Sequence, residues 1–243
     1  MRSLCLSLLL CLSLPAWADL HTQLWEKAGW PQQSRHFAAA LQQAQQQYAD
    51  TLPPAIHSAL VSNSNQRFEA GALQQRALAV LRRDLDDPQP ALDFFGSALG
   101  QRVVAAEVDA TSPQNLRRNA NGIPAIEASA TRQLLIRHLA QALPAREAAA
   151  EVTLALAGVA ADSLSGMLPG LIGREATEPL LQGQRERLIQ RLDGDIDNTL
   201  LYVYRDLSDA ELEEFAEFAQ SPAGQAYYQA ALGALRAALQ PGR

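Results

Sequence analysis

The stretch that decides the fold runs from Ser208 to Gly224 and reads SDAELEEFAEFAQSPAG. Ser208 and Glu211, three residues apart, form a capping box, in which each side chain accepts a hydrogen bond from an unpaired N–H at a helix start. Ser221-Pro222 begins a second helix, because the hydroxyl caps it and a proline at the first helical position loses no hydrogen bond. The stretch predicts two consecutive helices joined by a tight turn, with Gly224 allowing the partner helix to approach closely.

The rest of the chain has the same helical character. Ala, Leu, Gln and Arg dominate the composition, and these residues are strong helix formers. Apolar residues recur at spacings of three and four, for example along a long segment from about Glu178 to Asp206. Breaks containing proline or glycine separate such segments at intervals that suit antiparallel helices. The sequence therefore predicts an all-α bundle of about eight to ten helices.

A weak internal repeat divides the chain. Arg83-Asp84-Leu85 is echoed by Arg205-Asp206-Leu207, and after a shift of two residues further matches follow, pairing Phe94, Ser97, Gly100 and Gln101 with Phe218, Ser221, Gly224 and Gln225. Chance similarity between two Ala-rich helices is the alternative explanation. If the repeat is real, residues 19–111 and 176–243 are two related helical halves, and residues 112–175 connect them.

The second half resembles a known family. Glu211-Leu212, Phe218, Ser221-Pro222 and Gly224 match the pattern of the bacterial domain of unknown function 2059, and Ala219 departs from it, since a second aromatic residue often stands there. The resemblance covers the last quarter of the chain. It implies a helical domain of an exported protein, and it brings no established activity.

The first eighteen residues have the form of a secretory signal. Arg2 precedes a short apolar run from Leu4 to Leu14, and Ala16-Trp17-Ala18 offers small residues at the two positions that a signal peptidase reads. The run is too short for a membrane anchor, which needs roughly twenty apolar residues. A lipoprotein signal does not fit either, because Cys11 lies inside the apolar run. We expect cleavage after Ala18, a periplasmic location, and a mature chain without cysteine, since Cys5 leaves with the signal as well.

The sequence contains no recognisable catalytic or metal site. Its net charge of −6 and the lack of a basic patch argue against nucleic acid and anionic lipid as partners. No histidine has metal-ligand spacing such as H-E-x-x-H. Asp193, Asp195 and Asp197 are spaced as in a calcium loop, but Asn198 and Tyr204 stand where that loop needs Gly and Glu. We expect no cofactor and no enzymatic activity.

The leading hypothesis for function is a protein-interaction or adaptor module of the periplasm. It rests on the missing catalytic groups and on the helical repeats, which commonly build interaction surfaces. The best candidates for a contact with a partner are Tyr227 and Tyr228, whereas Phe215 and Phe218 are more consistent with core packing between the last two helices.

The alternative hypothesis is a carrier of a small apolar molecule or lipid. The segment from Val152 to Gly173 is apolar on nearly every face of a helix, which is typical of a centrally buried helix but also fits a ligand cavity. The residues predicted to wall such a cavity are Leu154, Leu156, Val159, Leu164, Met167, Leu168 and Leu171.

Overall fold

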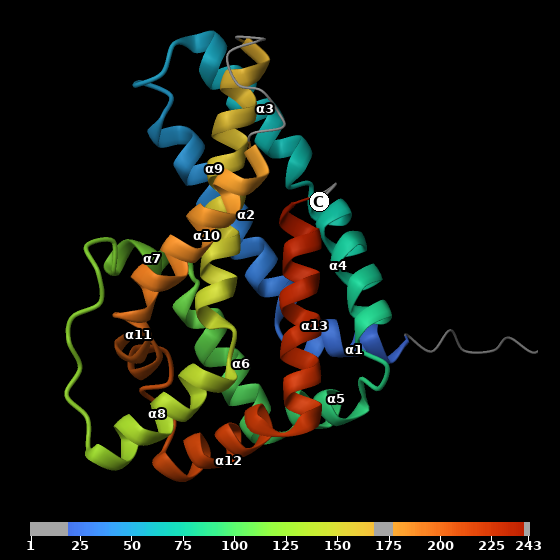
Figure 1. Ribbon diagram of the computed structural model, residues 1–243, viewed down its shortest axis with the longest axis vertical. Coiled ribbons are helices and arrows are strands. Elements are labelled where there is room, and N and C mark those ends of the chain that lie inside the picture. Colours follow the sequence, from blue (N-terminus) through green and yellow to red (C-terminus); the bar gives the residue numbers. More distant parts are fainter. Residues whose placement is uncertain (1–18, 168–176, 241–243) are drawn as a thin grey trace, which may run out of the picture.

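The computed structural model describes residues 19–167 and 177–240. Side chains are described in these ranges except for residues 160–182. Within these ranges the chain forms thirteen α-helices and no strand (Figure 1), which confirms the all-α prediction. Their number exceeds the predicted eight to ten because α1, α5, α7 and α11 are short, with six to eight residues each. None of the described helices is both long and apolar enough to cross a membrane.

The helices follow one another with short connections. Their bounds are α1 Leu20–Lys27, α2 Trp30–Gln47, α3 Pro54–Arg67, α4 Ala70–Asp84, α5 Gln89–Gly96, α6 Ala98–Ala110, α7 Pro113–Arg118, α8 Ala130–Ala142, α9 Ala145–Met167, α10 Thr177–Asp193, α11 Ile196–Val203, α12 Asp209–Gln220 and α13 Pro222–Leu239.

One hydrophobic core lies around the long pair α4 and α13, which run side by side in Figure 1. Leu24 and Trp25 of α1 contribute to this core, as do Ala155 and Val159 of α9. The C-terminal helix α13 thus packs chiefly against a helix of the N-terminal half.

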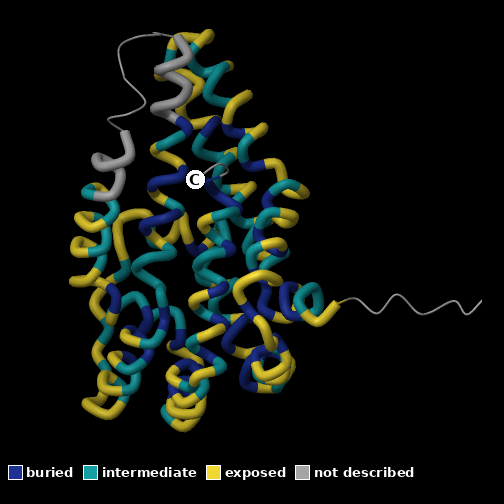
Figure 2. Tube along the Cα trace, turned by 45° about the vertical axis from the view of Figure 1, so that its right-hand side comes forward, coloured by how far each residue is buried: buried dark blue, intermediate teal, exposed yellow. Residues whose placement is uncertain are grey.

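A second core joins α8 and α12 with parts of α6 and α11. Phe215 and Leu212 of α12 are fully buried in it. Phe94 and Tyr228 pack against both cores and mark the line where they meet. Figure 2 shows buried residues on the helix faces that look inward and exposed residues on the outer faces.

The two turns of the predicted repeat have the same local geometry. In one, the Gly100 amide donates to Ser97 Oγ at 3.0 Å, and in the other the Gly224 amide donates to Ser221 Oγ at 3.0 Å. The Phe94 and Phe218 rings stack on each other with centroids 3.8 Å apart. Ser221 therefore caps α13 as predicted, and Ser97 caps α6 in the same way. The relation between the whole halves stays a prediction.

The long segment from Glu178 to Asp206 differs from the prediction of an unbroken helical stripe. The helix ends at Asp193, turns at Gly194-Asp195 and restarts at Ile196. The apolar spacing survives because Ile196 and Leu200 of α11 still face the second core. Periodicity alone did not reveal the break, which lies at the glycine.

Candidate functional site

The residues that carry the family resemblance have structural roles. The capping box of α12 is complete, with Ser208 and Glu211 each bonded to the other's backbone N–H. Leu212 is fully buried, and Phe218 packs between the two cores. These residues shape the α12–α13 turn, and none of them lines either of the two cavities described below.

The prediction of a partner-contact surface at Tyr227 is wrong, because Tyr227 is only 4% exposed and packs in the first core. Its ring lies 4.8 Å from that of Phe95, and its hydroxyl accepts a hydrogen bond from Trp30 Nε1 at 3.5 Å. Tyr228 is half-buried, and its hydroxyl is enclosed without a hydrogen-bond partner among the described residues. Both tyrosines point inward, because Tyr227 packs in the first core and Tyr228 packs against both cores.

The predicted ligand wall is found in part. Leu156 is 40% exposed and lines an apolar cavity, whereas Leu154 and Val159 are buried as core residues. The remaining predicted wall residues lie outside the described side chains, namely Leu164, Met167, Leu168 and Leu171.

The apolar cavity lies between α2, α9 and α13, with single residues from α1, α4 and α7, and its volume is about 410 Å³. Such a volume falls in the range of small-molecule pockets, which span about 300–1,000 Å³. Val152 and Leu156 form the α9 side, and Leu235 and Leu239 form the α13 side. The side chains around it are predominantly hydrocarbon, so it favours an apolar occupant.

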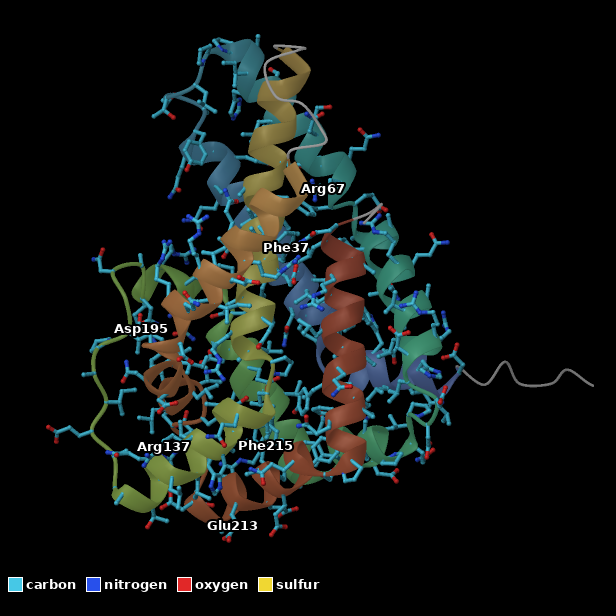
Figure 3. All side chains as sticks on the ribbon, in the orientation of Figure 1. Phe37, Arg67, Arg137, Asp195, Glu213 and Phe215 are labelled. Atoms are coloured by element: carbon cyan, nitrogen blue, oxygen red, sulfur yellow. The ribbon has the colours of Figure 1, made fainter. Side chains whose placement is uncertain are left out.

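Three aromatic rings line this cavity. Trp25 and Trp30 stack with centroids 4.7 Å apart, and both line the cavity. Phe37, labelled on α2 in Figure 3, also lines it and meets Phe68 edge to face at 5.1 Å. Flat, rigid rings give a wall that contacts a ligand with little loss of side-chain entropy.

A second cavity of about 210 Å³ adjoins the first. Trp30, Gln33 and Leu235 line both. The second cavity differs chemically, because Glu107 of α6 and three tyrosine residues line it, namely Tyr204, Tyr227 and Tyr228.

Glu107 is the unusual group of this second cavity. Tyr204 donates a hydrogen bond to Glu107 Oε1 at 2.8 Å, which favours the ionised carboxylate. Burial outweighs this bond and raises the pKa of Glu107 to about 7. Burial likewise raises the pKa of all three tyrosines, and the charge of Glu107 adds to the effect, so their hydroxyls stay neutral.

Glu151 is a buried charge with a different purpose. Its side chain has no exposed surface and pairs with Arg236 at 2.7 Å and Arg185 at 2.9 Å. Gln240 Nε2 donates to its second oxygen at 2.8 Å. The Glu151 carboxylate therefore links α9 to α10 and to the end of α13. Both of its oxygens are taken up by these partners, so its role is structural.

The described residues hold no cluster of three or more His, Cys, Asp or Glu able to bind a metal. His21 and His57 hydrogen-bond to backbone carbonyl oxygens, and His36 bonds to Thr111 Oγ1. The aspartates that are spaced as in a calcium loop lie around a helix break, where Asp193 pairs with Arg146.

Sequence reasoning missed Glu107 and the tryptophan pair. Glu107 stands one turn after Val103 and next to Val108, so it interrupts an apolar helix face. That interruption was the available signal. Trp25 and Trp30 gave none, since aromatic residues in amphipathic helices are usually core residues.

No protein-family model, no curated protein and no solved structure matches this chain.

Proposed function

We propose that this protein binds a small apolar molecule in the cavity between α2, α9 and α13, and that carrying such a molecule is its function. The observation that carries the proposal is the cavity of about 410 Å³ with its hydrocarbon and aromatic lining. A well-formed apolar pocket with a few polar groups at one end is the common form of a small-molecule site. The adaptor hypothesis loses its nominated contact at Tyr227, which packs in the core.

The carrier would act in the periplasm, after signal cleavage behind Ala18. In support, α1 starts at Leu20 and is capped by Asp19, so the first described helix begins directly after the predicted cleavage site. N-terminal sequencing of protein recovered from the periplasm should give Asp19 as the first residue. Recovery of the uncleaved chain from the cytoplasm would refute this location.

The test of binding uses a neutral fluorescent probe, N-phenyl-1-naphthylamine, whose emission rises in apolar surroundings. Ala40 lines the cavity on α2, and its neighbour Ala39 is exposed. An Ala40→Phe substitution fills the cavity and should weaken probe binding by about tenfold or more, which corresponds to about 1.4 kcal/mol. An Ala39→Phe substitution adds the same ring on the solvent face and should leave binding unchanged.

Circular dichroism and thermal melting of both variants control for folding. Saturable binding by the wild type that only Ala40→Phe weakens supports the proposal. Equal binding by all three proteins, or no binding by the wild type, refutes it.

A further inference from the structure

Two neighbouring cavities differ in the polarity of their linings. They share Trp30, Gln33 and Leu235 in their linings, so they lie against each other. The larger cavity is walled by hydrocarbon, and the smaller one contains the Glu107 carboxyl and the enclosed Tyr228 hydroxyl. This arrangement matches a molecule with a hydrocarbon chain and a polar head.

The charges around the smaller cavity indicate which charge the polar head of a ligand would carry. Among the described residues no ion pair involves Glu107, and no Arg or Lys lines either cavity. An anionic head such as a carboxylate would meet the Glu107 carboxylate with no cation nearby to offset the repulsion. A cationic head would instead supply the opposite charge that stabilises a buried carboxylate.

The rings around Glu107 favour the same head. Trp30, Tyr204 and two further tyrosines line the smaller cavity. Aromatic faces attract an ammonium group, and aromatic cages beside a carboxylate recognise alkylated amines. Resting on the proposed function, we propose that the ligand is an amphiphile whose protonated amine head pairs with the Glu107 carboxylate and whose hydrocarbon chain fills the apolar cavity.

The pairing makes binding depend on pH. Glu107 must be ionised to hold an ammonium group, and its pKa is raised to about 7 in the free protein. Affinity for the amine should therefore fall about tenfold for each pH unit below this pKa and level off above it. The tyrosines of the site remain neutral throughout, since burial raises the pKa of each.

The two other charged residues of α6 are already partnered. Arg102 pairs with Glu211, and Asp109 pairs with Arg205, both on the surface side of the helix. His36 lines the apolar cavity and bonds to Thr111 Oγ1. The pH profile of amine binding is therefore compared between the wild type and Glu107→Gln, and the profile of Glu107→Gln should be flat.

The test compares dodecylamine, dodecanol and dodecanoate at about pH 8, where an alkylamine is still protonated. Trp25 and Trp30 line the cavity, and they are the only tryptophans of a mature chain that begins at Asp19, since Trp17 leaves with the signal. Their fluorescence therefore reports occupancy. Dodecylamine should bind most tightly and dodecanoate least. A Glu107→Gln variant should bind dodecylamine about tenfold or more weakly and dodecanol within about twofold of the parent protein, as expected for the loss of one charged contact.

A Glu213→Gln variant is the control, since Glu213 is exposed on α12 (Figure 3) and should change neither affinity. If Glu107→Gln fails to fold, the pH profile of the wild type decides. Dodecanol binding as tightly as dodecylamine, or a flat amine profile between about pH 5.5 and 8, overturns this inference and leaves the carrier proposal standing. Absence of binding by all three compounds overturns both.

Discussion

The two glycines at the helix turns provide the sharpest test of the fold. An added Cβ at Gly100 would lie 1.9 Å from the Phe94 carbonyl oxygen, and one at Gly224 would lie 2.0 Å from the Phe218 carbonyl oxygen. Contacts of Cβ atoms below 3.0 Å essentially never occur. Replacing either glycine with alanine therefore requires the backbone carbonyl of the turn to move by about 1 Å, since these neighbours are main-chain atoms.

The magnitude follows from two opposing effects. Alanine stabilises a helix relative to glycine by about 0.5–1 kcal/mol. Overpacking against a fixed backbone costs about 1–3 kcal/mol, and the shift also strains the 3.0 Å bond between the Gly224 amide and Ser221 Oγ. We expect Gly100→Ala and Gly224→Ala each to lower the free energy of unfolding by about 2 kcal/mol, which lowers the Tm by about 4–8 °C for a chain of this size.

Gly96 provides the matched control, because it ends α5 beside the same turn and an added Cβ there meets nothing within 4 Å. Gly96→Ala should be neutral or slightly stabilising. Urea and thermal unfolding, monitored by circular dichroism at 222 nm, measure all three variants. If Gly224→Ala melts at the temperature of the wild type, the tight approach at the turn is wrong. If only one of the two turn glycines is sensitive, the equivalence of the two turns fails.

Four further predictions concern charges and mobility. Glu151→Gln removes a fully buried carboxylate that pairs with two partly exposed arginines, and we expect it to lower the free energy of unfolding by about 3 kcal/mol. Asp193→Asn should shift the Tm by no more than about 2 °C, because the aspartate is 64% exposed in its pair with Arg146. Burial raises the pKa of Glu107 from 4.5 to about 7 in the folded protein, so the folded protein holds a proton that the unfolded chain releases. The free energy of unfolding should therefore fall by up to about 3 kcal/mol as the pH rises through this interval. Urea titrations at about pH 5 and pH 8 measure this loss, and Glu107→Gln should remove it. In hydrogen exchange followed by mass spectrometry, the amides of α2 should exchange faster than those of α13, and the reverse order would contradict the packing described above.

The helical fold and the capped starts of its helices could be predicted from the sequence because they depend on neighbours in the chain. Ser208, Ser221 and Ser112 each bond to a backbone amide three residues later, which is a local interaction that the residue types disclose. The stacking of Phe94 on Phe218 could not be predicted in this way. This contact joins residues of two helices that are far apart in the sequence, and local sequence patterns do not predict such a contact.

The site depends almost entirely on such distant contacts. Glu107 of α6, Tyr204 after α11 and Tyr228 of α13 meet only after folding. The sequence indicated an apolar segment near Leu156, and this residue does line the cavity. The prediction for Tyr227 failed for a physical reason, because an aromatic residue beside a glycine-containing helix turn looks the same in sequence whether it faces water or a second core.

The two walls of the apolar cavity are held very differently. The Ser221 turn and the stacked phenylalanines fix the start of α13, and Arg76 Nη2 donates to the Ala238 carbonyl oxygen at 2.7 Å near its end. A cation at the C-terminal end also complements the helix dipole. On α2, by contrast, Gln45 is the only buried residue, and its Nε2 donates a hydrogen bond to Ser64 Oγ at 2.6 Å. A ligand that enters this cavity therefore displaces α2 at lower cost than α13, so we expect α13 to hold the polar groups in place while α2 admits the chain.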